Sequence, residues 1–299
     1  MTPVNCGSGM KMGGAMSRRV RSRKAGVLAP LRHRDFRLLM VSFAASAAGS
    51  WAYNVALAVF IFEQTDSLAW VGAATIGRFV PSLLFGAYGG VLAERFERVR
   101  LMASLDWLST GLMAVLTVVA ALEGSPVLAI VLAGLTSLNG VVYEPAVAAM
   151  TPETVPESDL AAANTLRNTV DNVAIVAGPA LGAVLLLVGP PAVAFGVNAA
   201  SFLFSGLVVM RLRVRSRPVD VTAGGRSGPL RQMAVGFRAI ASSTTATMLV
   251  AYSVVASFVY GVDTVQFVVL SDERLGTGVT GYGYLLAGLG VEAWRRQGW

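Results

Sequence analysis

The chain has 299 residues, of which 55% are hydrophobic and 14% are charged. Soluble domains usually carry about 25% charged residues, so this deficit, with a mean hydropathy of +0.63, argues against a soluble protein and indicates a membrane protein. The net charge of +7 would also suit a nucleic-acid binder. The basic residues, however, cluster between apolar runs, as the cytoplasmic loops of a membrane protein require. We therefore expect membrane lipid, and no nucleic acid, as a partner.

Residue types that serve catalysis and metal binding are scarce. Cys6 is the only cysteine and His33 is the only histidine. Metal sites built from these residues and His-dependent catalytic triads are therefore close to excluded. The sequence contains no Walker loop, so ATP is not the obvious energy source. We expect a protein that is not an enzyme and that needs no cofactor or metal.

The first long apolar run follows a Gly-, Ser- and Arg-rich tail. The tail shows no apolar face, which predicts a disordered basic segment over 1–30. The run Leu38–Phe62 carries no charge. A signal-peptide core has about 7–15 residues, whereas a membrane span needs about 20. This run therefore predicts a transmembrane helix and not a cleaved leader.

Six further runs have near-spanning length, and an eighth begins near Gly278. The six are Ala69–Leu92, Leu101–Leu122, Pro126–Ala146, Asn168–Val188, Ala192–Met210 and Ala246–Leu270. We expect an all-α integral membrane protein with a six-helix bundle over 31–210. A basic cytoplasmic linker over 211–245, broken by Pro and Gly, would lead to an incomplete second bundle over 246–299.

Basic residues alternate between the two ends of the predicted spans. The N-terminal part carries nine, the turn after the second span carries three, and the connection after the sixth carries seven. The turns after the first, third and fifth spans carry none. Because short basic loops stay inside, we expect a multi-pass protein of the bacterial inner membrane with its N-terminus in the cytoplasm.

The last apolar stretch of the chain is short. It covers about 281–291, and the charged segment 292–299 follows it directly. A stretch of this length cannot cross a hydrocarbon core of about 30 Å. We therefore hypothesise that the chain stops inside its eighth span through truncation or a frameshift.

The charged turn between the second and third spans carries the clearest motif. It reads Gly90-x-x-x-Glu94-Arg95-x-x-Arg98, and it resembles the signature loop of the major facilitator superfamily of secondary transporters. Glu94 stands where that family usually has Asp, and Glu97 stands where it usually has Gly. The resemblance implies a six-helix bundle paired with a second one.

The same turn has a mechanical interpretation. Gly90 would permit the close approach of a neighbouring helix. Glu94 can accept hydrogen bonds from helix N-terminal amides or an arginine, while Arg95 and Arg98 can reach carboxylates or lipid phosphates. Such contacts would form a latch that holds one conformation and releases it in another. The alternative is that these charges only set the topology.

Two further stretches resemble the enterobactin- and macrolide-type exporters of the superfamily. One is Tyr143-Glu144-Pro145-Ala146 with a later Leu-Ala-Ala-Ala-Asn, and the other is Gly178-Pro179-Ala-Leu-Gly182, which is also similar to a Gly-Pro motif of antiporters. The resemblance implies efflux of a hydrophobic drug-like or siderophore-like small molecule by alternating access, coupled to a proton or another ion.

The Gly-Pro stretch also has a physical interpretation, because small residues and proline change how a membrane helix packs. We expect Gly178, Pro179 and Gly182 to form a flexible, closely packed point in the fifth span.

Charged residues inside apolar runs are the strongest candidates for a substrate or coupling site. They are Arg78, Asp106, Asp171 and Asp263. Each costs about 2.5–3.5 kcal/mol at a helix centre, so each should face a cavity or a partner. Arg78 and Asp263 lie deepest. Asp106 and Asp171 lie nearer the cytoplasmic ends of their spans. For these two residues, a local ion pair is an equal alternative to a role in the cavity, and the partner of Asp171 would be Arg167.

Three more polar residues complete the candidate site. Tyr53 and Asn54 place hydrogen-bonding groups within the first span, where helix packing is the alternative role. Glu144 precedes Pro145 at the inner end of the fourth span, and the proline is expected to end or kink the helix. Glu144 would then act as a gate residue or only as an interface charge.

Two other functions stay open at the level of sequence. A fragment of a transporter that does not itself transport would fit the incomplete second bundle. A membrane-anchored sensor is the third alternative, although the sequence contains no soluble sensing domain.

Overall fold

The structure, a computed structural model, describes residues 26–214, 238 and 241–270. Within these residues it contains helices and no strand. The expected basic tail, most of the linker and the eighth span lie outside the described residues. The expectation of an all-α membrane protein is confirmed, since six of the described helices are long and apolar enough to cross a membrane.

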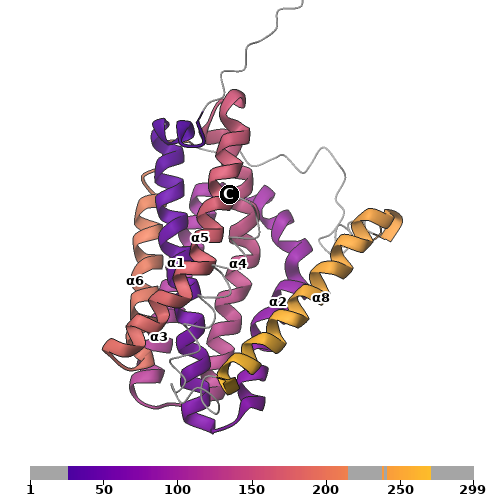
Figure 1. Ribbon diagram of the computed structural model, residues 1–299. Coiled ribbons are helices and arrows are strands. Elements are labelled where there is room, and N and C mark those ends of the chain that lie inside the picture. Colours follow the sequence, from indigo (N-terminus) through magenta and orange to yellow (C-terminus); the bar gives the residue numbers. More distant parts are fainter. Residues whose placement is uncertain (1–25, 215–237, 239–240, 271–299) are drawn as a thin grey trace, which may run out of the picture.

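The helices follow the order of the predicted spans. They are α1 (Arg34–Thr65), α2 (Leu68–Arg95), α3 (Arg98–Ala121), α4 (Pro126–Thr154), α5 (Leu160–Val188), α6 (Pro191–Val209) and α8 (Thr244–Val269), with two short 3-10 helices, η1 (Ala29–Arg32) and η2 (Glu157–Asp159). In Figure 1, α1 to α6 form one bundle and α8 runs obliquely beside α2. Helix α1 packs against both α5 and α6, while α3 packs on α6 and α2 packs on α4.

Short turns between the helices have identifiable causes in the sequence. Proline begins α4 and α6, where its fixed φ suits a first helical residue and its missing N–H costs nothing. Asp66 ends α1 and Glu123 follows α3, with left-handed φ values of 47° and 50° that reverse the chain. Glu97 caps α3, because its carboxylate accepts a hydrogen bond of 3.1 Å from the Arg100 N–H.

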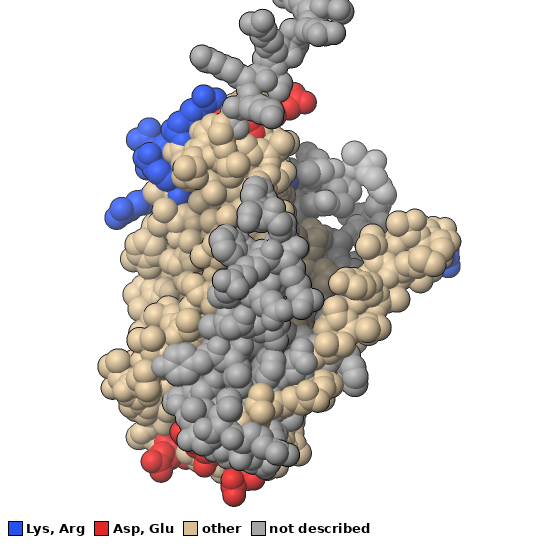
Figure 2. All heavy atoms as spheres, viewed as in Figure 1, with Lys and Arg blue, Asp and Glu red and all other residues tan. Residues whose placement is uncertain are grey.

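The two ends of the bundle carry opposite charges. Arginines gather at the end where α1 begins and α6 finishes, whereas acidic residues dominate the opposite end (Figure 2). The basic end includes Arg32, Arg34, Arg37, Arg211 and Arg213, and the acidic end includes Glu63, Asp66 and Glu123. This distribution agrees with the alternation of basic loops that the sequence shows.

The interior of the bundle is layered along its length. One buried apolar cluster contains Tyr53, Leu116 and Phe195, and a second one contains Phe36, Phe43 and Met102. Between the two clusters, α3, α4 and α6 each carry buried polar residues. These are Asp106, Ser109, Thr136, Asn139 and Ser205. A polar layer therefore divides the apolar core, and the candidate site lies in that layer.

Helix α4 continues beyond the residue where the sequence suggested an end. It runs through Pro145 and Pro152 to Thr154, and α5 begins at Leu160 instead of Asn168. Of the two outcomes expected at Pro145, an end of the helix is therefore wrong, and a kink stays a prediction. A proline removes a single backbone hydrogen bond, and the packing of Ala146, Val147 and Met150 in the second cluster keeps the helix intact on the far side.

Small residues bring α5 close to α1. A Cβ atom at Gly182 would lie 2.5 Å from the Ala52 carbonyl oxygen, and one at Gly178 would overlap the Trp51 Cβ. The helix continues unbroken through Pro179. The close packing expected at Gly178 and Gly182 is thus present, and the flexibility expected there stays a prediction.

The close approach expected at Gly90 lies one residue earlier. No described atom lies within 4 Å of a Cβ built at Gly90, whereas a Cβ at Gly89 would overlap the backbone of Val141 in α4. The two glycines point to different sides of α2, because successive residues on a helix are about 100° apart. Gly89 is therefore the residue that lets α2 pack tightly on α4.

We predict that Gly182→Val destabilises the bundle by about 1–3 kcal/mol, because the new side chain would have to displace the α1 backbone. The matched control is Gly111→Val in α3, since no described atom lies within 4 Å of a Cβ at Gly111. The fraction of monodisperse protein left after heating in detergent measures the difference. Equal heat resistance of the two variants would show that α1 and α5 do not touch at Gly182.

Candidate functional site

A cavity of about 220 Å³ lies in the polar layer of the bundle. All six helices from α1 to α6 contribute residues to its wall. Its polar lining residues are Ser46, Ser50, Tyr53, Arg78, Asp106, Ser109, Thr136, Ser137, Asn139, Tyr143, Glu144 and Asp171. A polar cavity among membrane-spanning helices is the setting in which ionisable residues are tolerated, because they face water or a ligand instead of lipid.

Most of the residues that the sequence singled out meet in this cavity. Five of them line it together: Tyr53, Arg78, Asp106, Glu144 and Asp171. Asn54 is not among the lining residues, and its side-chain oxygen is buried without a hydrogen-bond partner in the described part of the chain. Asp263 belongs to α8, but its side chain lies outside what the structure describes.

Asp106 is the most deeply buried ionisable residue in the cavity, with 1% of its surface exposed. The Ser205 hydroxyl donates to its Oδ2 atom at 2.8 Å, and the Tyr143 hydroxyl donates to the same atom at 3.4 Å. The two hydroxyl oxygens lie 3.2 Å apart. The ion pair that the sequence left open for Asp106 is thus replaced by a hydroxyl network that joins α3, α4 and α6.

A second polar contact extends this network. The Asn139 side-chain amide donates to the Ser109 hydroxyl at 3.2 Å, which links α4 to α3 one turn beyond Asp106. Sequence reasoning missed Ser205, Ser109 and Asn139, because single neutral polar residues are common in membrane helices. Their spacing was the available signal, since Asp106 and Ser109 lie on one helix face.

Arg78 is a cation without a counter-ion among the described residues. Its guanidinium lies 5.3 Å above the ring centre of Tyr53, and its Nε atom is buried without a hydrogen-bond partner in this part of the chain. Tyr53 is itself held edge-on against Phe195, with ring centres 6.4 Å apart. The contact with the Tyr53 ring stabilises the arginine and leaves hydrogen-bonding capacity at the cavity.

Arg167 forms its ion pair with a carboxylate on a facing helix. It donates to Glu144 at 2.5 Å across the α4–α5 interface, and its guanidinium lies 5.6 Å from the ring centre of Phe43. Of the two roles left open for Asp171, the structure places it on the cavity wall and shows no ion pair between it and Arg167. A carboxylate on a facing helix competes successfully with one that lies four residues away on the same helix.

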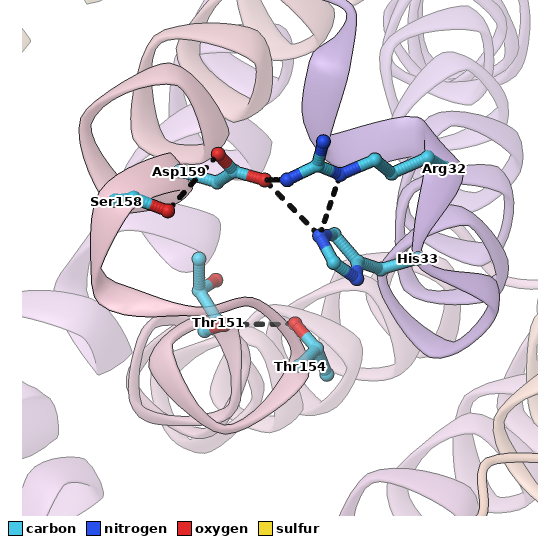
Figure 3. Close-up of polar contacts among 6 residues, drawn as sticks. All are labelled: Arg32, His33, Thr151, Thr154, Ser158 and Asp159. Atoms are coloured by element: carbon cyan, nitrogen blue, oxygen red, sulfur yellow. Dashed lines mark hydrogen bonds and ion pairs between the residues drawn. The ribbon is translucent and has the colours of Figure 1, made fainter. Parts of the chain in front are cut away.

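A cluster of polar contacts ties the basic end of the bundle together (Figure 3). Asp159, which is 2% exposed, accepts from Arg32 at 2.8 Å, and its Oδ2 atom lies 3.0 Å from the His33 Nε2 atom. Ser158 donates to the other carboxylate oxygen at 3.4 Å. The cluster joins the residues just before α1 to the connection between α4 and α5. It contains the only histidine of the chain.

Two more contacts cross the same end. Arg98 forms an ion pair with Glu153 and donates to the Ala149 carbonyl at 3.4 Å. Asp35 accepts from the backbone N–H groups of Arg213 and Val214 at 3.2 and 3.1 Å, which holds the exit of α6 against the start of α1. These contacts fix neighbouring helix ends relative to one another.

The motif of the α2–α3 turn is only partly described. Arg98 reaches a carboxylate, as the latch interpretation requires. Arg95 is exposed, and the side chain of Glu94 lies outside the described atoms. The latch therefore stays a prediction.

Comparison with known proteins identifies the family. Residues 25–296 match the family described as "Transmembrane secretion effector". The chain belongs to this family of the major facilitator superfamily. The match covers the six-helix bundle, α8 and the segments on either side of α8.

Three bacterial proteins are similar to part of this chain. Macrolide efflux protein A of Streptococcus pyogenes is 24% identical over 180 residues, which are 60% of this chain and 44% of that protein. The putative bacilysin exporter of Bacillus subtilis is 28% identical over 56% of this chain and 42% of its own length. The staphyloferrin A transporter of Staphylococcus aureus is 24% identical over 58% and 45%. The chain thus spans about half the length of the relatives it matches.

We predict that Ser205→Ala destabilises the protein by about 1.5–3 kcal/mol, because it removes a hydrogen bond to a buried charged group. Ser201→Ala in the same helix is the control, since the Ser201 hydroxyl donates to the Asn198 carbonyl within its own helix at 2.8 Å. Midpoints of thermal unfolding in one detergent compare the two. A Ser205→Ala midpoint no lower than that of Ser201→Ala would contradict the hydroxyl network around Asp106.

Proposed function

We propose that the protein is a secondary active transporter that exports a hydrophobic drug-like or siderophore-like small molecule by alternating access. The observation that carries this proposal is the cavity in the polar layer, with Arg78 and Asp106 at its wall. Charged residues inside membrane helices are costly and are usually retained for a substrate or ion pathway.

The architecture supports this proposal. Secondary transporters of this kind bind their substrates near the middle of the membrane, on helices that belong to a repeated bundle. Helices α1 to α6 make one such bundle, and their cavity lies in the polar layer between the two apolar clusters. The family and the names of the similar proteins, which include efflux and export proteins, support the same conclusion.

Asp106 is the residue that we assign to ion coupling. Its partners are the hydroxyls of Ser205 and Tyr143. A hydroxyl can donate to a carboxylate or accept from a carboxylic acid. Asp106 can therefore take up and release a proton without breaking an ion pair, and the hydroxyls need only to reorient.

We further propose that the basic end of the bundle faces the cytoplasm of a bacterial cell, which places the N-terminus inside and the protein in the inner membrane. The gathering of arginines at that end supports this orientation (Figure 2). The turn containing Gly90, Glu94, Arg95 and Arg98 would then form a cytoplasmic latch. The ion pair between Arg98 and Glu153 supports this role.

The proposal is tested in bacterial cells that lack their own efflux pumps. We predict that cells producing the chain accumulate less of a hydrophobic fluorescent dye than cells with an empty vector. Asp106→Asn should abolish at least about nine tenths of this difference, because the coupling proton has lost its site. Asp66→Asn, an exposed carboxylate at the end of α1, should leave the difference intact.

The amount of each protein in the membrane fraction is measured in the same cells. Dye accumulation equal to that of the empty vector, with the chain present in the membrane, would contradict transport and favour a non-transporting fragment or a sensor. Full efflux by Asp106→Asn would remove Asp106 from the coupling role.

A further inference from the structure

The cavity extends along helix α1. Its wall includes Phe43, Ser46, Ser50 and Tyr53, which follow one face of α1. Phe43 and Tyr53 are ten residues apart, and this spacing corresponds to about 15 Å along a helix. A volume of about 220 Å³ suits a small ligand that lies along this helix.

One end of the cavity is cationic. At Tyr53, the guanidinium of Arg78 lies above the aromatic ring, and its Nε atom is buried without a hydrogen-bond partner in the described part of the bundle. Leaving a buried donor unsatisfied is costly. A ligand that carries a carboxylate or a similar anion would supply the missing acceptor.

The other end of the cavity is anionic. At Phe43, the charge of Arg167 is neutralised by its ion pair with Glu144. Asp171 lines the same cavity and forms no ion pair with a described residue. Asp106 is bound by Tyr143, which packs on the cluster that contains Phe43. Three carboxylates, those of Asp106, Glu144 and Asp171, therefore share this end with Arg167, the single cation that the described residues place there, which leaves an excess of negative charge.

We propose that the cavity binds a small, extended zwitterion, with a protonated amine at Asp106 and Asp171 and an anionic group at Arg78. The distance along α1, less a hydrogen-bond length at each end, separates the two charges of the ligand by roughly 10 Å. This inference rests on the proposed function, because it names the class of molecule that the transporter's cavity holds.

A ligand with a single charge fits this cavity less well. A cation alone leaves Arg78 without an acceptor, and an anion alone is repelled by Asp106 and Asp171. Both penalties are larger inside the bundle than in water, because the surroundings screen charges weakly. The arrangement thus selects for two opposite charges at a fixed separation.

The probe for the test is tritiated tri-alanine, whose amine and carboxylate lie about 10 Å apart when the chain is extended. Binding to the purified full chain in lipid nanodiscs is compared with that of N-acetyl tri-alanine and tri-alanine amide, each of which has lost one charge. We expect the free tripeptide to bind at least about tenfold more tightly than either blocked form, which corresponds to about 1.4 kcal/mol.

Two variants assign the ends of the cavity. Arg78→Gln should erase the preference for tri-alanine over its amide and keep the preference over the N-acetyl form. Asp171→Asn should do the reverse. Arg100→Gln and Asp66→Asn, which change exposed residues that do not line the cavity, should retain both preferences.

Three results would overturn the inference. The first is the absence of tri-alanine binding, and the second is equal binding of all three peptides. The third is an equal loss of affinity for all three peptides in both variants, which would indicate a structural role for Arg78 and Asp171. Dye efflux by the unmodified chain is measured alongside. Efflux that persists without peptide selectivity refutes the zwitterion and leaves the proposed transport function standing, whereas loss of efflux refutes transport itself.

Discussion

The burial of the Asp106 carboxylate between membrane helices constrains the rest of the bundle. A charge in this position needs hydrogen-bond donors, and two hydroxyls from α4 and α6 supply them. The three helices must therefore keep their register at this depth. Apolar side chains then fill the space on either side, which produces two apolar clusters separated by a polar layer. The cavity occupies the part of that layer that the hydroxyl network does not fill.

Helix α1 connects the polar layer to the close contact with α5 and to the basic end of the bundle. Residues of α1 line the cavity, and Trp51 and Ala52 of the same helix pack closely on Gly178 and Gly182 of α5. Its first turn is held at the basic end by Asp159 and by the contact of Asp35 with the exit of α6. A movement of α1 would therefore change the cavity and the basic end together, as alternating access requires of a helix that lines the substrate path.

The sequence predicted the architecture well and the helix ends poorly. Long apolar runs located α1 to α6, because a helix that crosses a membrane needs about 20 predominantly apolar residues. The extension of α4 past Pro145 was missed because a helix can continue beyond the apolar stretch that marks its span. In the site, the cost of an intramembrane charge pointed to Arg78 and Asp106. It did not reveal Ser205 or the pairing of Arg167 with Glu144, since such partners come from other helices and depend on their register.

The central claim is that a water-accessible polar cavity lies inside the membrane part of the bundle. Cysteine accessibility in membrane vesicles tests it most directly, because Cys6 is the only cysteine to replace. In a Cys6→Ser background, Ser50→Cys places a thiol on the cavity wall, and Val131→Cys places one on the exposed apolar face of α4. A charged methanethiosulfonate reagent should modify Ser50→Cys at least about tenfold faster, because only a hydrated thiol forms the reactive thiolate. Equal or slower modification of Ser50→Cys would contradict the account.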